Sequence, residues 1–95
     1  MMVEREKNIE QYLVRRVKEL GGRAYKFVSP GNNGVPDRIV ILPGGKIFFA
    51  EMKAPGRKTT ALQNMQIKRL QDLGQKVYVL DSRESIDLCL GGEGE

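Results

Sequence analysis

The sequence predicts a single α/β domain in which a mixed β-sheet is flanked by helices, in the order helix, strand, strand, strand, helix, strand, helix. Two segments, residues 4–20 and 60–73, place apolar side chains at helical spacing. Two apolar runs, residues 39–42 and 47–50, flank a Pro-Gly-Gly turn and predict a β-hairpin. The length of 95 residues is that of one domain, 1–95.

The first half of the chain divides at its glycines and prolines. A helix is expected over residues 4–20 and ends at Gly21-Gly22, because glycine readily adopts the left-handed turn that follows a helix. A short strand is expected over residues 24–29, and a loop over residues 29–34, which are rich in Pro, Gly and Asn. The next strand should begin near Val35, which precedes a proline. The apolar stripe of the helix consists of Ile9, Leu13, Val17 and Leu20.

The predicted hairpin is apolar on both faces along residues 39–42 and 47–50. Strands of this kind are normally covered on both faces. We therefore expect helices, or a second subunit, to pack on each side of the hairpin.

The hairpin connection allows two registers. A loop made of the two glycines alone would place Asp37 opposite Met52 and turn Glu51 to the other face. A three-residue loop that includes Pro43 would instead place Asp37 opposite Glu51, with Lys53 on the same face. We expect the three-residue register, or a bulge with the same effect.

The second half of the chain predicts a helix, a strand and a short helix. The helix over residues 60–73 opens with a capping box and ends at Gly74. A strand over residues 76–80 follows a helix, so it can lie parallel beside a central strand. A short helix is expected over residues 85–90, and residues 91–95 are expected to be a frayed tail. The inward side of the longer helix is expected to be Leu62, Met65, Arg69 through its stem, Leu70 and Leu73.

Composition excludes several kinds of site. With no histidine, no mechanism can use imidazole, and the single cysteine, Cys89, can form neither an internal disulfide nor a cysteine-based zinc site. The net charge of +4 permits a polyanionic partner without establishing one. No apolar run approaches the ~20 residues that span a bilayer, and the N-terminus lacks the apolar core of a secretory signal. We expect a cytoplasmic protein with no membrane segment.

Asp37, Glu51 and Lys53 form the cluster that could carry chemistry. Two carboxylates that face one spot repel each other unless a cation or a proton is present. Carboxylate oxygens suit Mg²⁺, and the lysine could hold an attacking water or stabilise developing negative charge. The alternative is structural, since Pro-Asp often begins a strand and Glu-x-Lys often lines a solvated edge. The apolar residues around the cluster favour a site at the rim of a buried sheet.

Gly34-Val35-Pro36-Asp37 followed by Ala50-Glu51-Met52-Lys53 resembles the PD-(D/E)XK nuclease pattern. With both long helices and Gln63 included, residues 9–82 are similar to the stand-alone VRR-NUC family of phages and bacteria. The resemblance implies a restriction-endonuclease-like core, Mg²⁺ or Mn²⁺ dependence, and structure-selective endonucleolytic cleavage of DNA. Because stand-alone members are similar to Holliday-junction resolvases, it also implies a homodimer that acts on branched or four-way DNA, in the cytoplasm of a bacterial or phage-infected cell.

The resemblance also assigns roles to single residues. Asp37 and Glu51 would be metal ligands, joined by the backbone carbonyl of Met52, and Lys53 would be the catalytic lysine. Glu10 is preferred over Glu6, one turn earlier, as the catalytic acid of the first helix and as a further metal ligand. Gln63 would orient a water or contact phosphate, while its alternative role is to cap the helix.

Several basic residues flank this site and would bind DNA phosphates, which gives affinity without sequence readout. They are Lys26, Arg38, Arg57 and Lys58. In contrast, Arg15, Arg16 and Lys18 of the first helix are expected on a solvated face.

Three other functions remain open at this point. A flap or nonspecific DNA nuclease would use the same residues on other substrates. A nonenzymatic DNA-binding module could share the fold, and a structural protein could use the charges as a salt-bridge network. The presence of all three core residues favours a nuclease.

Overall fold

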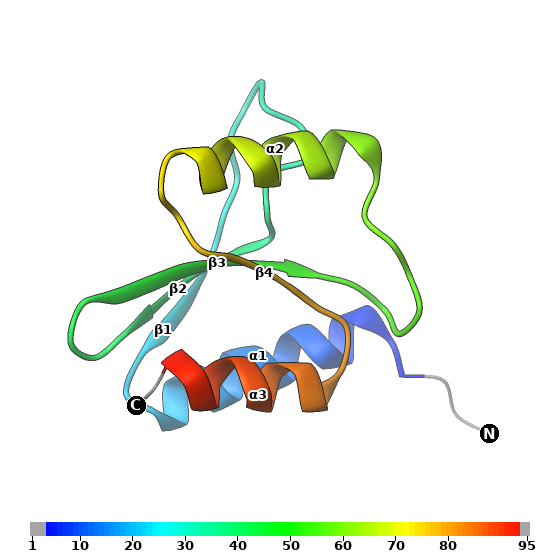
Figure 1. Cartoon of the computed structure of the whole chain (residues 1–95). Helices are drawn as coiled ribbons and strands as arrows, with labels where there is room; N and C mark the ends of the chain where they lie inside the picture. Colours follow the sequence, from blue (N-terminus) through cyan, green and yellow to red (C-terminus); the bar gives the residue numbers. More distant parts are fainter. Residues whose placement is uncertain (1–3, 94–95) are drawn as a thin grey trace.

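The computed structural model describes residues 4–93 and has the predicted order of elements. The four strands form one sheet in the order β1-β2-β3-β4, antiparallel between β1, β2 and β3 and parallel between β3 and β4. Helices α1 and α3 lie together on one face of this sheet, and α2 lies on the other (Figure 1). The elements are α1 (Glu6–Glu19), β1 (Arg23–Lys26), β2 (Arg38–Leu42), β3 (Lys46–Met52), α2 (Ala61–Asp72), β4 (Val77–Leu80) and α3 (Arg83–Glu93).

The main core lies between the sheet and the α1–α3 pair. Successive strand residues point to opposite faces, so the even-numbered residues of β2, β3 and β4 point together toward these helices. From the helix side, α1 supplies the predicted residues Ile9, Leu13 and Val17, whereas Leu20 is exposed at the end of the helix. The other core residues are Val40, Leu42, Phe48, Ala50, Met52, Leu80, Ile86, Cys89 and Leu90.

The β2–β3 hairpin has the predicted three-residue register. Leu42 pairs with Lys46 and Ile39 with Phe49, so Pro43, Gly44 and Gly45 form the loop. Both glycines have positive φ values, 87° and 78°, in the left-handed region that favours glycine. Continued along the strands, this register places Asp37 opposite Glu51.

Helix α2 is turned differently from the prediction. Leu62, Met65 and Leu73 were expected to face inward, but their exposed fractions are 46%, 40% and 77%. The buried residue of α2 is Gln66, whose Nε2 donates to the carbonyl of Asn33 at 3.3 Å. The loop over residues 27–37 therefore packs against the side of α2 that carries Gln66.

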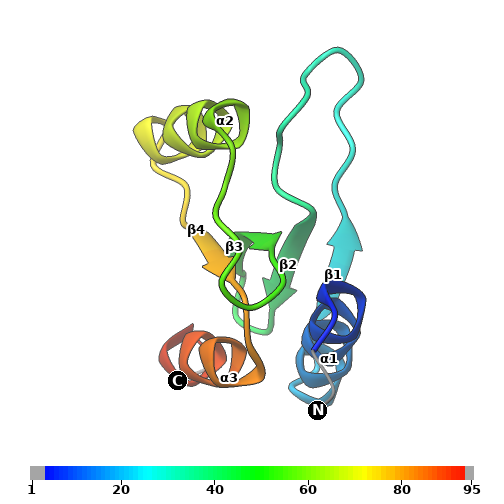
Figure 2. The ribbon, with the colours of Figure 1, turned by 90° about the vertical axis from the view of Figure 1, so that its right-hand side faces the viewer.

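The face of the sheet that carries α2 is covered only in part. Figure 2 shows α2 above the β3–β4 side of the sheet, while the long loop rises from the β1–β2 side. Ile41 and Ile47, which pair across β2 and β3, stay exposed on this face. The expectation that both faces are covered is thus correct for the α1–α3 face and incomplete for the other.

The C-terminal segment is more ordered than predicted. Residues 91–93 continue α3, so the expected frayed tail is wrong for them, while Gly94 and Glu95 lie outside the described residues. Glu93 is only 7% exposed and accepts hydrogen bonds from Lys76 Nζ at 2.9 and 3.2 Å and from the hydroxyl of Tyr78. These bonds to Tyr78 of β4 and to Lys76 just before it offset the low helix propensity of Gly91-Gly92, which costs about 1 kcal/mol per glycine. Within residues 4–93, no helix is long and apolar enough to cross a membrane.

Candidate active site

Asp37 lies where the long loop joins β2, and hydrogen bonds to two neighbouring strands fix it there. Its carbonyl accepts from the backbone N–H of Phe27 at 2.9 Å, just beyond the end of β1. Its side-chain Oδ2 accepts from the backbone N–H of Met52 at 2.8 Å, at the end of β3. The carboxylate is therefore held across the end of the sheet, beside Glu51 and Met52.

Glu51 is a buried carboxylate on β3. Its exposed fraction is 2%, and its Oε1 has no hydrogen-bond partner within residues 4–93. Its Oε2 lies 3.8 Å from Nζ of Lys53, which is itself largely buried. A buried, unpartnered carboxylate oxygen is costly, so this position is suited to binding a positively charged group.

The electrostatics of the two carboxylates show the same deficit of positive charge. Burial and the nearby charge of Asp37 raise the pKa of Glu51 from 4.5 to about 7, although Lys53 opposes the rise. Burial also raises the pKa of Asp37, and the negative charge of Glu10 adds to this effect, while the N–H of Met52 acts in the opposite direction. One lysine therefore does not balance the carboxylates, which favours binding of a cation or a proton.

Two acids of α1 lie beside this pair. Glu10 Oε2 accepts from Nε of Arg38 at 2.7 Å. Glu6 has no ion-pair partner within residues 4–93, and burial together with the charge of Asp37 raises its pKa. Within the same residues, no group of three or more Asp, Glu, His or Cys side chains is placed to hold a metal ion. The structure thus brings both acids of α1 to the rim of the site, and the choice of Glu10 over Glu6 stays a prediction.

Gln63 has the capping role that the sequence offered as its alternative. Its Oε1 accepts from the backbone N–H of Thr60 at 2.9 Å, and its own N–H donates to Oγ1 of Thr60 at 3.2 Å. Its Nε2 has no hydrogen-bond partner within residues 4–93, so a second role toward water or phosphate stays a prediction.

The predicted phosphate-binding residues separate into two groups. Lys26, Arg57 and Lys58 are exposed. Arg38 is instead engaged inside the protein, because its Nε donates to Glu10 and its Nη1 donates to the carbonyl of Ala24 at 3.0 Å. In this structure Arg38 joins α1, β1 and β2 next to Asp37.

Gln66, which contacts the loop that leads into the site, is not among the residues predicted from the sequence. Its bond to Asn33 fixes this loop against α2 four residues before Asp37. The loop comes so close to the helix that a Cβ at Gly34 would lie 3.0 Å from the backbone of Leu62. The available signal was the spacing of Gln63, Gln66, Ile67 and Leu70, which forms a second helical stripe beside the more apolar one.

Comparison with known proteins identifies the family to which the chain belongs. No model of a known protein family matches the sequence. The chain is 56% identical over 84 residues to "Putative nuclease p44" of Acyrthosiphon pisum secondary endosymbiont phage 1, covering 88% of this chain and 90% of that protein. It also matches a solved "VRR_NUC domain" with a TM-score of 0.85 and 32% identity, over 90% of this chain and 94% of the other. The α/β fold, the element order and the similarity to a phage nuclease agree, and the chain therefore belongs to the VRR-NUC family of nucleases.

Proposed function

We propose that this nuclease is a metal-dependent endonuclease of the PD-(D/E)XK type that hydrolyses DNA phosphodiesters, preferentially in branched DNA such as a four-way junction. The observation that carries the proposal is the pairing of Asp37 with the buried carboxylate of Glu51, one of whose oxygens has no partner in the described chain. The similarity to a phage nuclease supports the reaction class and an action in the cytoplasm of a bacterial or phage-infected cell.

The residues present fit a divalent cation. Carboxylate and carbonyl oxygens are the ligands that Mg²⁺ and Mn²⁺ prefer, and the unpartnered Oε1 of Glu51 is a donor of this kind. Asp37, Glu51 and the carbonyl of Met52 would hold the ion, with Glu10 or Glu6 at the side. When bound, such an ion offsets the charge of the phosphate and lowers the pKa of a water.

The protein groups around this position have separate roles. The N–H of Met52 orients Asp37, and the sheet register keeps Asp37 beside Glu51. Lys53 presents a compact positive charge that can hold the attacking water or stabilise negative charge developing on the phosphate. Lys26, Arg57 and Lys58 would contact the DNA backbone without reading its sequence.

A symmetric homodimer would explain why apolar side chains are exposed and how both strands of a four-way junction could be cut. Leu62 and Met65 of α2, Leu73 at its C-terminal end, and Ile41 and Ile47 of the sheet are all exposed. Covering such residues with a second copy removes apolar surface from water. A pair related by a two-fold axis would also present two sites to the two strands that must be cut in a four-way junction.

A substrate panel tests the proposal. Four-way junction, flap, duplex and single-stranded DNA would be incubated with the protein in Mg²⁺, in Mn²⁺ and in EDTA. We expect metal-dependent cleavage that is fastest on the junction. Equal cleavage of all substrates would instead identify a nonspecific nuclease, and binding without cleavage in either metal would identify a nonenzymatic DNA-binding module.

A further inference from the structure

A polar pocket lies between α1 and α3, away from the candidate active site. It has a volume of about 280 Å³ and is lined by Asn8, Gln11, Tyr12, Arg15 and Arg83. The four residues of α1 follow the spacing i, i+3, i+4 and i+7 and so lie on one side of the helix. At 100° per residue, Glu10 points to the opposite side of α1. The pocket and the Asp37–Glu51 pair are therefore separated by α1.

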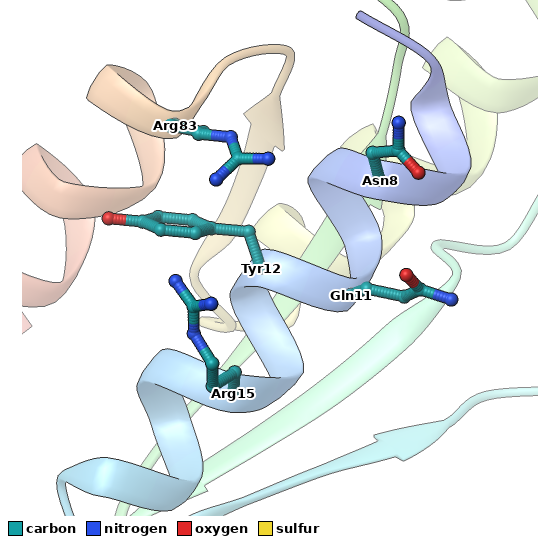
Figure 3. A pocket seen from close by; sticks show the side chains of 5 residues that line it. All are labelled: Asn8, Gln11, Tyr12, Arg15 and Arg83. Carbon is teal, nitrogen blue, oxygen red and sulfur yellow. The ribbon is translucent and has the colours of Figure 1, made fainter.

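An aromatic ring between two guanidinium groups forms the wall of this pocket. The guanidinium carbon of Arg83 lies 5.0 Å from the centroid of the Tyr12 ring, and that of Arg15 lies 5.1 Å from it. Figure 3 shows the ring edge-on, with Arg83 on one side and Arg15 on the other. The hydroxyl of Tyr12 donates to Oδ1 of Asp87 at 2.7 Å, which fixes the ring and with it the two stacked groups.

Stacking leaves the hydrogen-bonding edge of a guanidinium available. The interaction with the ring uses the face of the group, whereas its N–H donors lie in its plane. Nε of Arg83 donates to Glu4 at 2.7 Å, and Arg15 has no ion-pair partner within residues 4–93. Arg15 therefore provides a held, positively charged donor edge that no carboxylate of the described chain occupies.

The chemistry of the lining selects an oxyanion. Arginine presents a planar fork that matches phosphate oxygens, and the amides of Asn8 and Gln11 add neutral donors. Because guanidinium groups lie on both sides of the Tyr12 ring, it offers no free face on which a base could stack. Two neighbouring carboxylates are already engaged, Glu4 by Arg83 and Asp87 by Tyr12 and Arg16. Glu84 also acts electrostatically on Arg83, so Arg15 is the more available of the two guanidinium groups.

We infer that this pocket is a second, noncatalytic DNA site that binds a backbone phosphate through Arg15 and Arg83, on the far side of α1 from the active site. The inference rests on the proposal that DNA is the substrate. Such a contact would hold DNA that continues past the cut position, and it would add affinity without sequence readout.

Arg15→Gln tests the role of the pocket, with Arg69→Gln as the matched control. The control removes the same type of side chain from an exposed position on α2, across the sheet from the pocket. The logarithm of the DNA-binding constant falls linearly with the logarithm of the salt concentration. Losing one phosphate contact should reduce the magnitude of this slope by about 0.9, which amounts to roughly fivefold weaker binding near 0.15 M salt. We expect this loss for Arg15→Gln, measured by anisotropy of a labelled duplex in EDTA, and no comparable loss for Arg69→Gln.

NMR titration of isotope-labelled protein with the same duplex shows directly which side chains respond to DNA. The side-chain Nε–H signals of Arg15 and Arg83 should shift together with signals around Asp37. If only the signals around Asp37 shift, or if both variants weaken binding equally, the inference is overturned while the proposed substrate stands. If no signal shifts, DNA itself fails as the ligand. A response of Arg15 to inorganic phosphate but not to DNA would identify a small-anion site and would also overturn the inference.

Discussion

Replacing Glu51 by glutamine should change how the stability of the protein depends on pH. The pKa of Glu51 is raised from 4.5 to about 7 by burial and by Asp37. A carboxyl group whose pKa is higher in the folded state favours folding when protonated, so its ionisation destabilises the fold as pH rises from about 4.5 to above 7. With 1.36 kcal/mol for each pKa unit, the full effect is about 3 kcal/mol. Glutamine cannot ionise and should remove this loss.

Urea unfolding in EDTA, at several pH values between 4.5 and 8, measures the effect. The difference in free energy of unfolding between Glu51→Gln and the wild type should shift in favour of the variant by about 3 kcal/mol across this range. Glu19→Gln is a suitable control, because Glu19 is an exposed glutamate of α1. At pH 8, Mn²⁺ should stabilise the wild type more than Glu51→Gln, since a bound ion offsets the same repulsion. A difference in stability that does not vary with pH would show that Glu51 does not ionise with a raised pKa in the folded protein.

Further predictions concern catalysis, assembly and the C-terminal end of α3. Asp37→Ala and Lys53→Ala should each reduce cleavage at least ~100-fold while junction binding survives, because Asp37 would hold the metal ion and Lys53 would stabilise negative charge on the phosphate. Cleavage and binding assays on one junction check this, and near-normal cleavage by either variant would contradict it. The double variant Ile47→Lys with Leu73→Asp should sediment as a monomer at concentrations where the wild type is a dimer, since both side chains are exposed on the α2 face; a wild type that is itself monomeric would remove the basis for the dimer. Glu93→Gln should lower the free energy of unfolding by about 1–2 kcal/mol at neutral pH, because Lys76 and Tyr78 lose a charged acceptor. The bonds to Tyr78 and Lys76 lower the pKa of Glu93. The difference in free energy of unfolding between Glu93→Gln and the wild type should therefore shrink as pH falls through the acid range. A difference that stays constant down to low pH would show that these bonds are not its cause.

The order of elements and the register could be predicted because local chemistry determines them. Pro43-Gly44-Gly45 forms a three-residue turn whose glycines have positive φ values, and that turn alone decides that Asp37 lies opposite Glu51. The alternation of β2 and β3 then places Lys53 on the same face. The central part of the candidate site therefore follows from short-range rules.

The orientation of α2 could not be predicted, because two neighbouring stripes of this helix were both plausible. Leu62, Met65 and Leu73 form the more apolar stripe, yet Gln66 is the residue that becomes buried. Gln66 contacts Asn33, which is 33 residues away in sequence. The stripe that contains Gln66 is visible in the sequence, but a contact this distant along the chain gives no local sign of which stripe turns inward.

Long-range ion pairs also explain the other differences. Glu93 holds the last turn of α3 through Lys76 and Tyr78, although the two glycines before it favour fraying. Arg38 is drawn to Glu10 and the carbonyl of Ala24, although its position beside Asp37 suggested a phosphate contact. In each case a side chain that could face solvent is fixed by a partner from another element.

Cleavage of a four-way junction by Glu51→Ala, compared with the wild type in Mg²⁺ and in Mn²⁺, tests whether Glu51 holds a catalytic metal ion. Glu51 supplies the buried carboxylate oxygen that has no partner in the described chain, and the proposed metal site depends on it. The wild type should cut the junction in either metal and not in EDTA, and Glu51→Ala should bind the junction without cutting it. Full activity of Glu51→Ala in Mg²⁺ would show that the proposed metal site is wrong.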